Sequence, residues 1–109
     1  MKRQFIKHQH TLLASAIFPA LLLALPVNTM ASDMRGAILA NPCAGCHGTN
    51  GASPGSIPAI DDMSAEDIKE ELMEFKTDEH KGTIMNRIAK GYTDAEIDLI
   101  ARYFGSMHK

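Results

Sequence analysis

Two cysteines and a histidine stand close together near the middle of this 109-residue chain, in the stretch Cys43-Ala44-Gly45-Cys46-His47. Cysteines at this spacing, followed directly by a histidine, are typical of covalent haem attachment. Both thiols would lie on one face of a turn and form thioethers with one porphyrin. The imidazole of His47 would then bind the iron. The sequence therefore predicts one c-type haem, held by Cys43 and Cys46 and ligated by His47.

Three other roles for a closely spaced cysteine pair fit this sequence less well. A zinc site needs a second pair of ligands at a short spacing, and the histidines further along the chain are His80 and His108. A thioredoxin-like redox pair accompanies a βαβ pattern, and the sequence shows no strand-like alternation. A disulfide across so short a span is geometrically poor and would stabilise little.

The first 31 residues are typical of a secretory signal peptide. A positively charged start precedes an apolar run over residues 12–27, and the small residues around Ala31 offer a cleavage site before Ser32. A retained membrane anchor is the alternative, but the run is shorter than the ~20 residues that a membrane span prefers. The start contains no twin-arginine pair, so we expect export through the Sec route and a periplasmic product.

Cleavage would leave one small domain over residues 32–109. It would remove three of the 11 lysine and arginine residues and none of the 13 acidic residues, which gives a net charge of about −5. That balance argues against nucleic acid or a membrane surface as a partner, and it favours a protein with a neutral or basic docking face. Because so short a chain has a marginal core, we expect the apo-protein to be poorly folded until haem is attached.

The helical spacing of apolar residues and the residues that typically start and end helices predict an all-α domain. The first helix is expected over residues 33–40, capped by Ser32 or Asp33. A brief helix is expected over residues 83–90, closed by Gly91 as its C-terminal cap.

Two longer helices carry clear start signals. Ser64 with Asp67, and Thr93 with Glu96, each form a capping box. Their apolar stripes are Ile68, Leu72 and Phe75 in the earlier helix and Ile97, Ile100, Ala101 and Phe104 in the later one. The remaining face of the earlier helix is acidic, and we expect it to be solvated.

The second axial ligand decides what the iron can do, because a thioether favours reduced iron and an open position admits small ligands. Met85 lies far enough along the chain to cross over the porphyrin. We expect Met73 to face water and Met107 to lie in a frayed tail, so Met85 is the favoured methionine. His80 is the runner-up, and an open position is the third alternative.

Pro58 is a candidate partner for the iron-binding histidine. Its carbonyl could accept the free ring N–H of His47, which would fix the tautomer of the ligand and raise its basicity. On sequence alone, an ordinary loop proline is the simpler interpretation.

With these motifs in view, the chain resembles the class I c-type cytochromes over nearly all of the region after residue 31. The resemblance rests on the CAGCH motif, the Ile57-Pro58-Ala59-Ile60 segment and the stretch Met85-Asn86-Arg87-Ile88-Ala89-Lys90-Gly91-Tyr92-Thr93-Asp94. It implies a helical fold around one haem, with terminal helices crossing through Gly36 and either Tyr103 or Phe104. It also implies that Pro58 orients His47 and that Met85 is the axial methionine.

A narrower resemblance concerns the segments 74–76 and 84–92, which are similar to the cytochrome subunits of flavocytochrome c sulfide dehydrogenases. Cytochromes c4 and c553 carry comparable segments. This resemblance implies an electron-transfer protein, itself no enzyme, that takes electrons from a sulfide-oxidising flavoprotein. The pair Asp61-Asp62 departs from the family pattern, and the single CxxCH differs from two-haem relatives.

Two alternative functions stay open on the sequence. One is a freely diffusing, c553-like carrier between respiratory or photosynthetic complexes. The other is a haem enzyme or gas sensor whose iron keeps an open sixth position.

Overall fold

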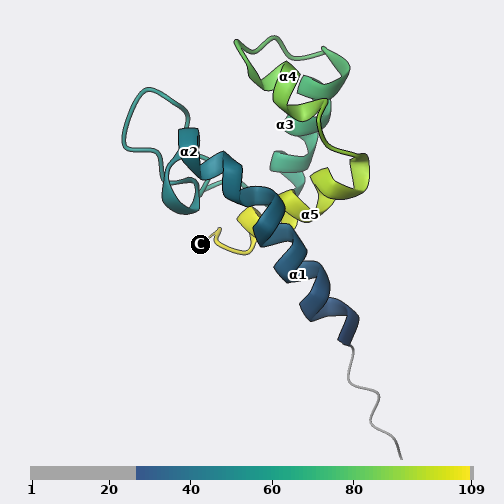
Figure 1. Ribbon diagram of the computed structural model, residues 1–109. Coiled ribbons are helices and arrows are strands. Elements are labelled where there is room, and N and C mark those ends of the chain that lie inside the picture. The colour runs from purple at the N-terminus through teal and green to yellow at the C-terminus, as the bar shows by residue number, and fades with distance from the viewer. Residues whose placement is uncertain (1–26, 109) are drawn as a thin grey trace, which may run out of the picture.

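The computed structural model describes residues 27–108, and in that range the chain forms helices and loops without a strand. The helices are α1 (Val27–Ala40), α2 (Ala44–His47), α3 (Ala65–Thr77), α4 (Met85–Ala89) and α5 (Asp94–Gly105), with short 3₁₀ turns at Asn41–Cys43 and Thr49–Gly51 (Figure 1). The predicted all-α architecture is confirmed. None of these helices has both the length and the apolar character that a membrane span requires. The predicted signal peptide over residues 1–31 lies mostly outside the described residues.

Helix α1 begins at Val27, six residues before the predicted start, so the predicted caps Ser32 and Asp33 are wrong. Both residues lie inside the helix. The Ser32 hydroxyl donates to the carbonyl of Thr29, 2.7 Å away, which is the back-bonding of a serine in a helix interior. The two polar residues suggested a start, but the chain before them is already helical.

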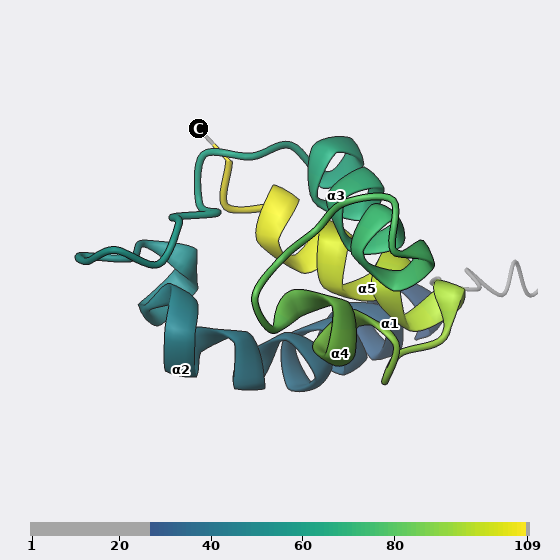
Figure 2. The ribbon, with the colours of Figure 1, turned by 90° about the horizontal axis from the view of Figure 1, so that it is seen from above.

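The first and last long helices cross at Gly36, as predicted. This glycine is buried, and a Cβ atom added to it would lie 2.8 Å from the carbonyl oxygen of Leu99 and 3.5 Å from the Cβ of Tyr103. Only a glycine lets the two backbones approach this closely. Figures 1 and 2 show α1 and α5 side by side in both views. An ion pair of 3.3 Å between Arg35 and Glu96 also joins the two helices.

The start signals of α3 and α5 are confirmed. Ser64 accepts the backbone N–H of Asp67 and Thr93 accepts that of Glu96, and both acidic side chains accept the N–H of their cap in return. A second close approach joins these helices at Gly105, where an added Cβ would lie 2.6 Å from the backbone nitrogen of Ala65. The sequence analysis did not predict this contact.

The core lies between α1, α3 and α5. Its buried cluster consists of Ala40, Ile68, Ile100, Ala101 and Phe104. The predicted stripe of α5 is confirmed, since Ile97 is buried as well. Met107 packs against this cluster, so its placement in a frayed tail was wrong. A turn in which the Met107 N–H donates to the Phe104 carbonyl (2.9 Å) folds it back.

Helix α4 is shorter than predicted, covering Met85–Ala89 rather than residues 83–90. Gly91 was wrongly predicted as its left-handed cap. Lys90 ends the helix in a right-handed conformation (φ −65°, ψ −18°), and the positive-φ glycines of the described chain are Gly48 and Gly51. A left-handed cap does occur at Asp78 (φ 64°), where it ends α3.

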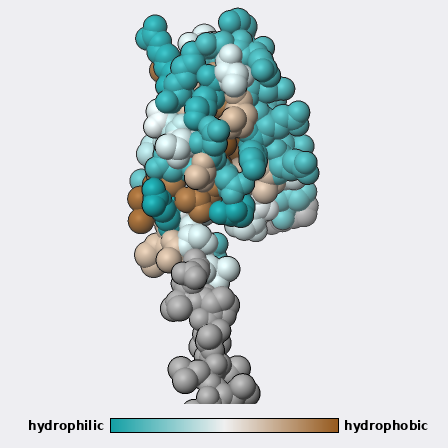
Figure 3. Space-filling view, turned by 90° about the vertical axis from the view of Figure 1, so that its right-hand side faces the viewer, coloured by the Kyte–Doolittle hydropathy of each residue, from teal (hydrophilic) through white to brown (hydrophobic). Residues whose placement is uncertain are grey.

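The surface is mostly hydrophilic in the view of Figure 3, with apolar patches toward the end where the grey N-terminal trace leaves. Three side chains of α1 are strongly exposed and lie at spacings of four residues. They are Met30, Met34 and Ile38.

Candidate functional site

The two cysteines lie on a helical segment that continues almost directly from α1. Pro42 stands in the first turn of the 3₁₀ segment Asn41–Cys43, and Cys43 keeps right-handed helical angles as the chain enters α2. Residues three apart on such a segment lie on nearly the same face, as thioether bonds to one porphyrin require. Cys43 is half-buried, Cys46 is exposed, and both thiols are free.

The environment of Cys43 argues against a redox role for the pair. Burial raises the pKa of the Cys43 thiol, a backbone hydrogen bond offsets part of this rise, and the nearby Cys46 adds to it. Redox-active CxxC pairs depend on the opposite shift, because the thiolate is the reactive species. The geometry and chemistry of this pair therefore fit covalent attachment better than thiol exchange.

His47 is the last residue of α2, and its ring is held by the loop that follows. Nδ1 lies 2.6 Å from the carbonyl oxygen of Pro58, so the predicted partner is in place. A carbonyl can only accept, which makes Nδ1 the donor and leaves the lone pair of Nε2 for a metal. The simpler interpretation of Pro58 as an ordinary loop residue does not account for this contact.

Two glycines bring Pro58 back to the histidine. Gly48 (φ 80°) ends α2, and Gly51 (φ 82°) accepts the N–H of Ile60 at 2.9 Å, closing the loop between them. A Cβ added to Gly51 would lie 2.6 Å from Cγ1 of Ile60. The two glycines are the sequence signal that could have revealed the closure of this loop.

Met85 is half-buried and is the first residue of α4. In the view of Figure 1, α2 lies at the left of the molecule and α4 lies at the top, next to α3. Within residues 27–108 no hydrogen bond joins Met85 to the CAGCH segment. The structure thus brings His47 and Pro58 together and leaves Met85 on a separate element, packed on α3.

His80, the runner-up ligand, has other partners. Its Nδ1 lies 2.9 Å from a carboxylate oxygen of Glu71 and 3.8 Å from one of Glu74, and its ring stacks on Phe75 with centroids 4.4 Å apart. All three polar side chains are about two-fifths exposed. Phe75, predicted on the apolar stripe, therefore packs at least partly against this histidine. These contacts hold His80 on the acidic face of α3.

A haem would fit the apolar surface beside the predicted ligands. Ile57 precedes Pro58, Ile84 precedes Met85, and Ile88 lies one turn further along α4, yet these side chains are 43%, 58% and 36% exposed. A large, flat, apolar macrocycle would remove such surface from water. With two thiols, an imidazole and a thioether as available donors, the residues present fit a c-type haem.

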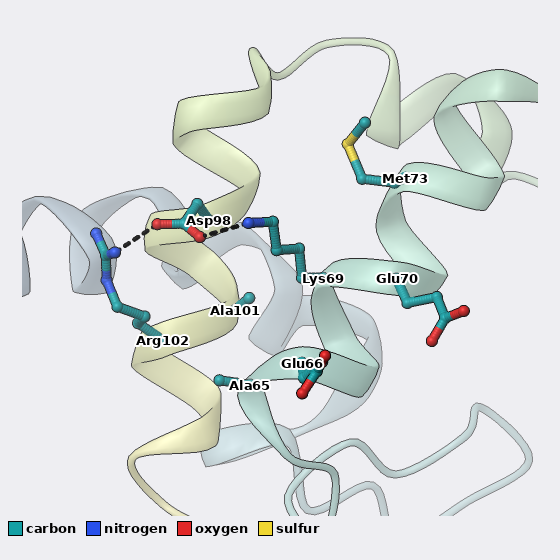
Figure 4. A pocket seen from close by; sticks show the side chains of 8 residues that line it. All are labelled: Ala65, Glu66, Lys69, Glu70, Met73, Asp98, Ala101 and Arg102. Atoms are coloured by element: carbon teal, nitrogen blue, oxygen red, sulfur yellow. Dashed lines mark hydrogen bonds and ion pairs between the residues drawn. The ribbon is translucent and has the colours of Figure 1, made fainter.

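A groove with a volume of about 550 Å³ lies elsewhere, between α3 and α5. Figure 4 shows Asp98 between Lys69 and Arg102, which both pair with it. Met73, expected to face water, is half-buried at this groove. No predicted haem ligand lines it, and both of its cations pair with Asp98, so the candidate site is the CAGCH motif instead.

Comparisons with known proteins show the family to which this chain belongs. The sequence profile of the cytochrome c family matches residues 34–108. The chain is 48% identical over 86 residues to the cytochrome subunit of sulfide dehydrogenase from Chlorobaculum tepidum, covering 79% of this chain and 78% of that protein. It is 33% identical to cytochrome c-553 from Helicobacter pylori, covering 79% of this chain and 90% of the relative.

A further relative is cytochrome c-553 from Desulfomicrobium norvegicum, which is 29% identical over 68% of this chain and 96% of its own length. The family profile covers well over half of the chain, and two of these relatives exceed 30% identity over most of both sequences. The chain therefore belongs to the cytochrome c family, and it is an electron carrier with one covalently bound haem c.

Proposed function

We propose that this cytochrome carries its haem on Cys43 and Cys46, ligates the iron through His47 and Met85, and passes single electrons in the periplasm. The observation that carries the ligand assignment is the 2.6 Å contact between His47 Nδ1 and the Pro58 carbonyl. It orients the ring and leaves Nε2 as the metal-binding atom. A hydrogen bond this short fixes the ring of His47 in one orientation, as a metal ligand requires.

When bound, the haem supplies a ferric–ferrous couple that takes up and releases one electron. The Pro58 carbonyl accepts the Nδ1 hydrogen of His47, which fixes the tautomer and the orientation of the ring. The Met85 thioether favours the ferrous state and raises the potential. With His47 and Met85 as ligands in both oxidation states, little of the chain would have to move.

Electrons would enter or leave beside the two small residues of the CAGCH motif. Gly45 is exposed, and no atom lies within 4 Å of the position that a Cβ would occupy there. Ala44 next to it is also small. A partner could therefore approach this edge of the haem closely, as electron transfer requires.

The proposed electron donor is a sulfide-oxidising flavoprotein. The relative from Chlorobaculum tepidum is named as the cytochrome subunit of a sulfide dehydrogenase, and its resemblance extends over about four-fifths of both chains. The proposal includes removal of residues 1–31 as a signal peptide. The family match, which begins at residue 34, supports a haem domain that starts after this segment.

A freely diffusing carrier is the second candidate function, and the c-553 relatives favour it. The match covers 90% of one such relative and 96% of another, so nearly the whole length of each resembles part of this chain. The two candidates differ in whether a flavoprotein stays bound to the cytochrome.

Purification of the tagged cytochrome from its native source separates them. We expect a flavin-containing protein to co-elute in a constant ratio to haem through gel filtration, and sulfide to reduce the haem of that complex. A haem-containing monomer that elutes without flavin, and that is not reduced by sulfide in the cell extract, would contradict the flavoprotein proposal and favour the diffusing carrier.

A further inference from the structure

The short helix that carries Met85 is not stable on its own. Helix α4 has five residues, and Ile84, which precedes it, makes no side-chain cap. Isolated helices of this length do not form in water. The position of Met85 must therefore be set by contacts between the start of α4 and the rest of the chain.

The side chain of Asn86 makes most of these contacts. Its Oδ1 accepts the backbone N–H of Gly82 at 2.8 Å. Its Nδ2 donates to the carbonyl of His80 at 2.7 Å and to the carbonyl of Phe75 at 3.0 Å, with the Asp78 carboxylate 3.2 Å away. Both hydrogens of the amide are thus used, and a half-buried asparagine joins the end of α3 to the start of α4.

The loop between these helices depends on this amide. Asp78 leaves α3 in a left-handed conformation, and the N–H groups of Glu79 and His80 both donate to the Glu74 carbonyl. The Phe75 ring then packs against Gly82, where an added Cβ would lie 2.8 Å from Cε1 of the ring and 3.4 Å from the Cβ of Met85. Asn86 closes the turn that this packing begins.

We infer that Asn86 is a positioning residue for the axial methionine. By fastening residues 78–82 to the first turn of α4, its amide holds the Met85 backbone in one place relative to α3, so the thioether is presented ready for the iron. This inference rests on the proposed function, in which Met85 is the axial ligand.

Two variants test it in the haem-containing protein. Asn86→Ala removes all of the hydrogen bonds. Asn86→Asp keeps the acceptor for Gly82 but loses the donors, and it places a second carboxylate beside Asp78. Lys90→Gln is the matched control, because Lys90 pairs with Asp78 from the end of α4 without contacting the amide.

The readouts are the sulfur-to-iron charge-transfer band of the ferric protein and the affinity of added imidazole, which competes with Met85 for the iron. Losing several hydrogen bonds of this kind is expected to loosen the methionine about tenfold. We therefore expect imidazole to bind about tenfold more tightly to Asn86→Ala and Asn86→Asp, and unchanged binding to Lys90→Gln. Thermal melting of each variant separates this effect from a general loss of stability.

The outcomes distinguish the inference from the proposed function. If the unmodified protein shows the band and Met85→Ala lacks it, while both Asn86 variants keep the original imidazole affinity, the inference fails and the ligand assignment stands. An equal rise in affinity for Lys90→Gln also overturns it, because loop stability alone would then explain the result. Absence of the band from the unmodified protein overturns the ligand assignment and the inference together.

Discussion

The hydrogen bond from His47 to Pro58 shows how much of this site depends on a few atoms. His47 could be predicted from its place directly after the CxxC pair, whereas the role of Pro58, eleven residues further on, was implied by the family resemblance. The role of Asn86 could not be predicted. Most of its partners are backbone groups that come near only after the loop has folded, and nothing in the neighbouring sequence identifies these groups.

Replacement of Met85 tests the second ligand at the same scale. Met85→Ala is expected to lower the potential, because loss of the thioether removes its preference for ferrous iron. Axial ligands set haem potentials over a range of about 0.8 V, so a fall on the order of 0.1 V is expected. The reduced variant should also bind carbon monoxide at neutral pH.

Redox titration and carbon monoxide difference spectra measure both effects. His80→Ala is the control. The ring of His80 contacts Glu71 and Phe75, so we expect the potential of the haem in this variant to be unchanged. If Met85→Ala keeps the original ligation while His80→Ala loses it, the runner-up histidine is the ligand.

At the scale of the helices, the starts that carry a capping box could be predicted, whereas the start of α1 could not. The capping boxes of α3 and α5 require two side chains at a fixed spacing, so Ser64 and Thr93 marked both starts correctly. Gly91 misled because a glycine after a helix permits a left-handed cap without requiring one. The end of α3 was instead capped at Asp78, an aspartate whose conformation is supported by Asn86 and Lys90.

The crossing of α1 and α5 makes a prediction about Gly36. Valine and glycine differ little in helix propensity, so the effect of Gly36→Val is set by the clash with the Leu99 carbonyl, which belongs to backbone and cannot swing away. Overpacking of this kind costs about 1–3 kcal/mol. Urea unfolding of the haem-containing protein measures the free energy of unfolding.

The matched control is Gly55→Val, because no atom lies within 4 Å of a Cβ added at that loop position. We expect Gly55→Val to change the free energy of unfolding by no more than ~0.5 kcal/mol, as for an ordinary surface substitution. Equal losses for the two variants would contradict the account of the crossing.

For the molecule as a whole, the lowered pKa values of three carboxylates indicate how folding stability depends on pH. A hydrogen bond from Lys69 lowers the pKa of Asp98, the capping bonds of Thr93 lower that of Glu96, and Lys90 lowers that of Asp78. A carboxylate whose pKa is lowered in the folded state stabilises the fold at pH values above the ordinary pKa of that carboxylate. That stabilisation is lost as the pH falls further toward the folded-state pKa.

We therefore expect the melting temperature of the haem-containing protein to fall as the pH drops below the ordinary values of 4.5 for Glu and 3.8 for Asp. Glu96→Gln keeps a side chain that can complete the capping box but cannot titrate, so its melting temperature should fall less steeply over this range. The same slope in both proteins would show that Glu96 does not contribute.

The whole molecule also depends on its cofactor. The fully buried cluster lies between α1, α3 and α5, while isoleucines beside the predicted ligands remain exposed. We expect the double variant Cys43→Ala/Cys46→Ala, exported without attached haem, to show weak helical circular dichroism and no cooperative thermal transition. A cooperative melt like that of the haem-containing protein would contradict this prediction.

The central claim is tested most directly by mass spectrometry of peptides from the exported, purified protein. The account predicts that the peptide containing Cys43–His47 carries the added mass of one haem after denaturation, with no free thiol on Cys43 or Cys46. A colourless product in which this peptide has its unmodified mass, with both thiols free or holding zinc, would contradict it.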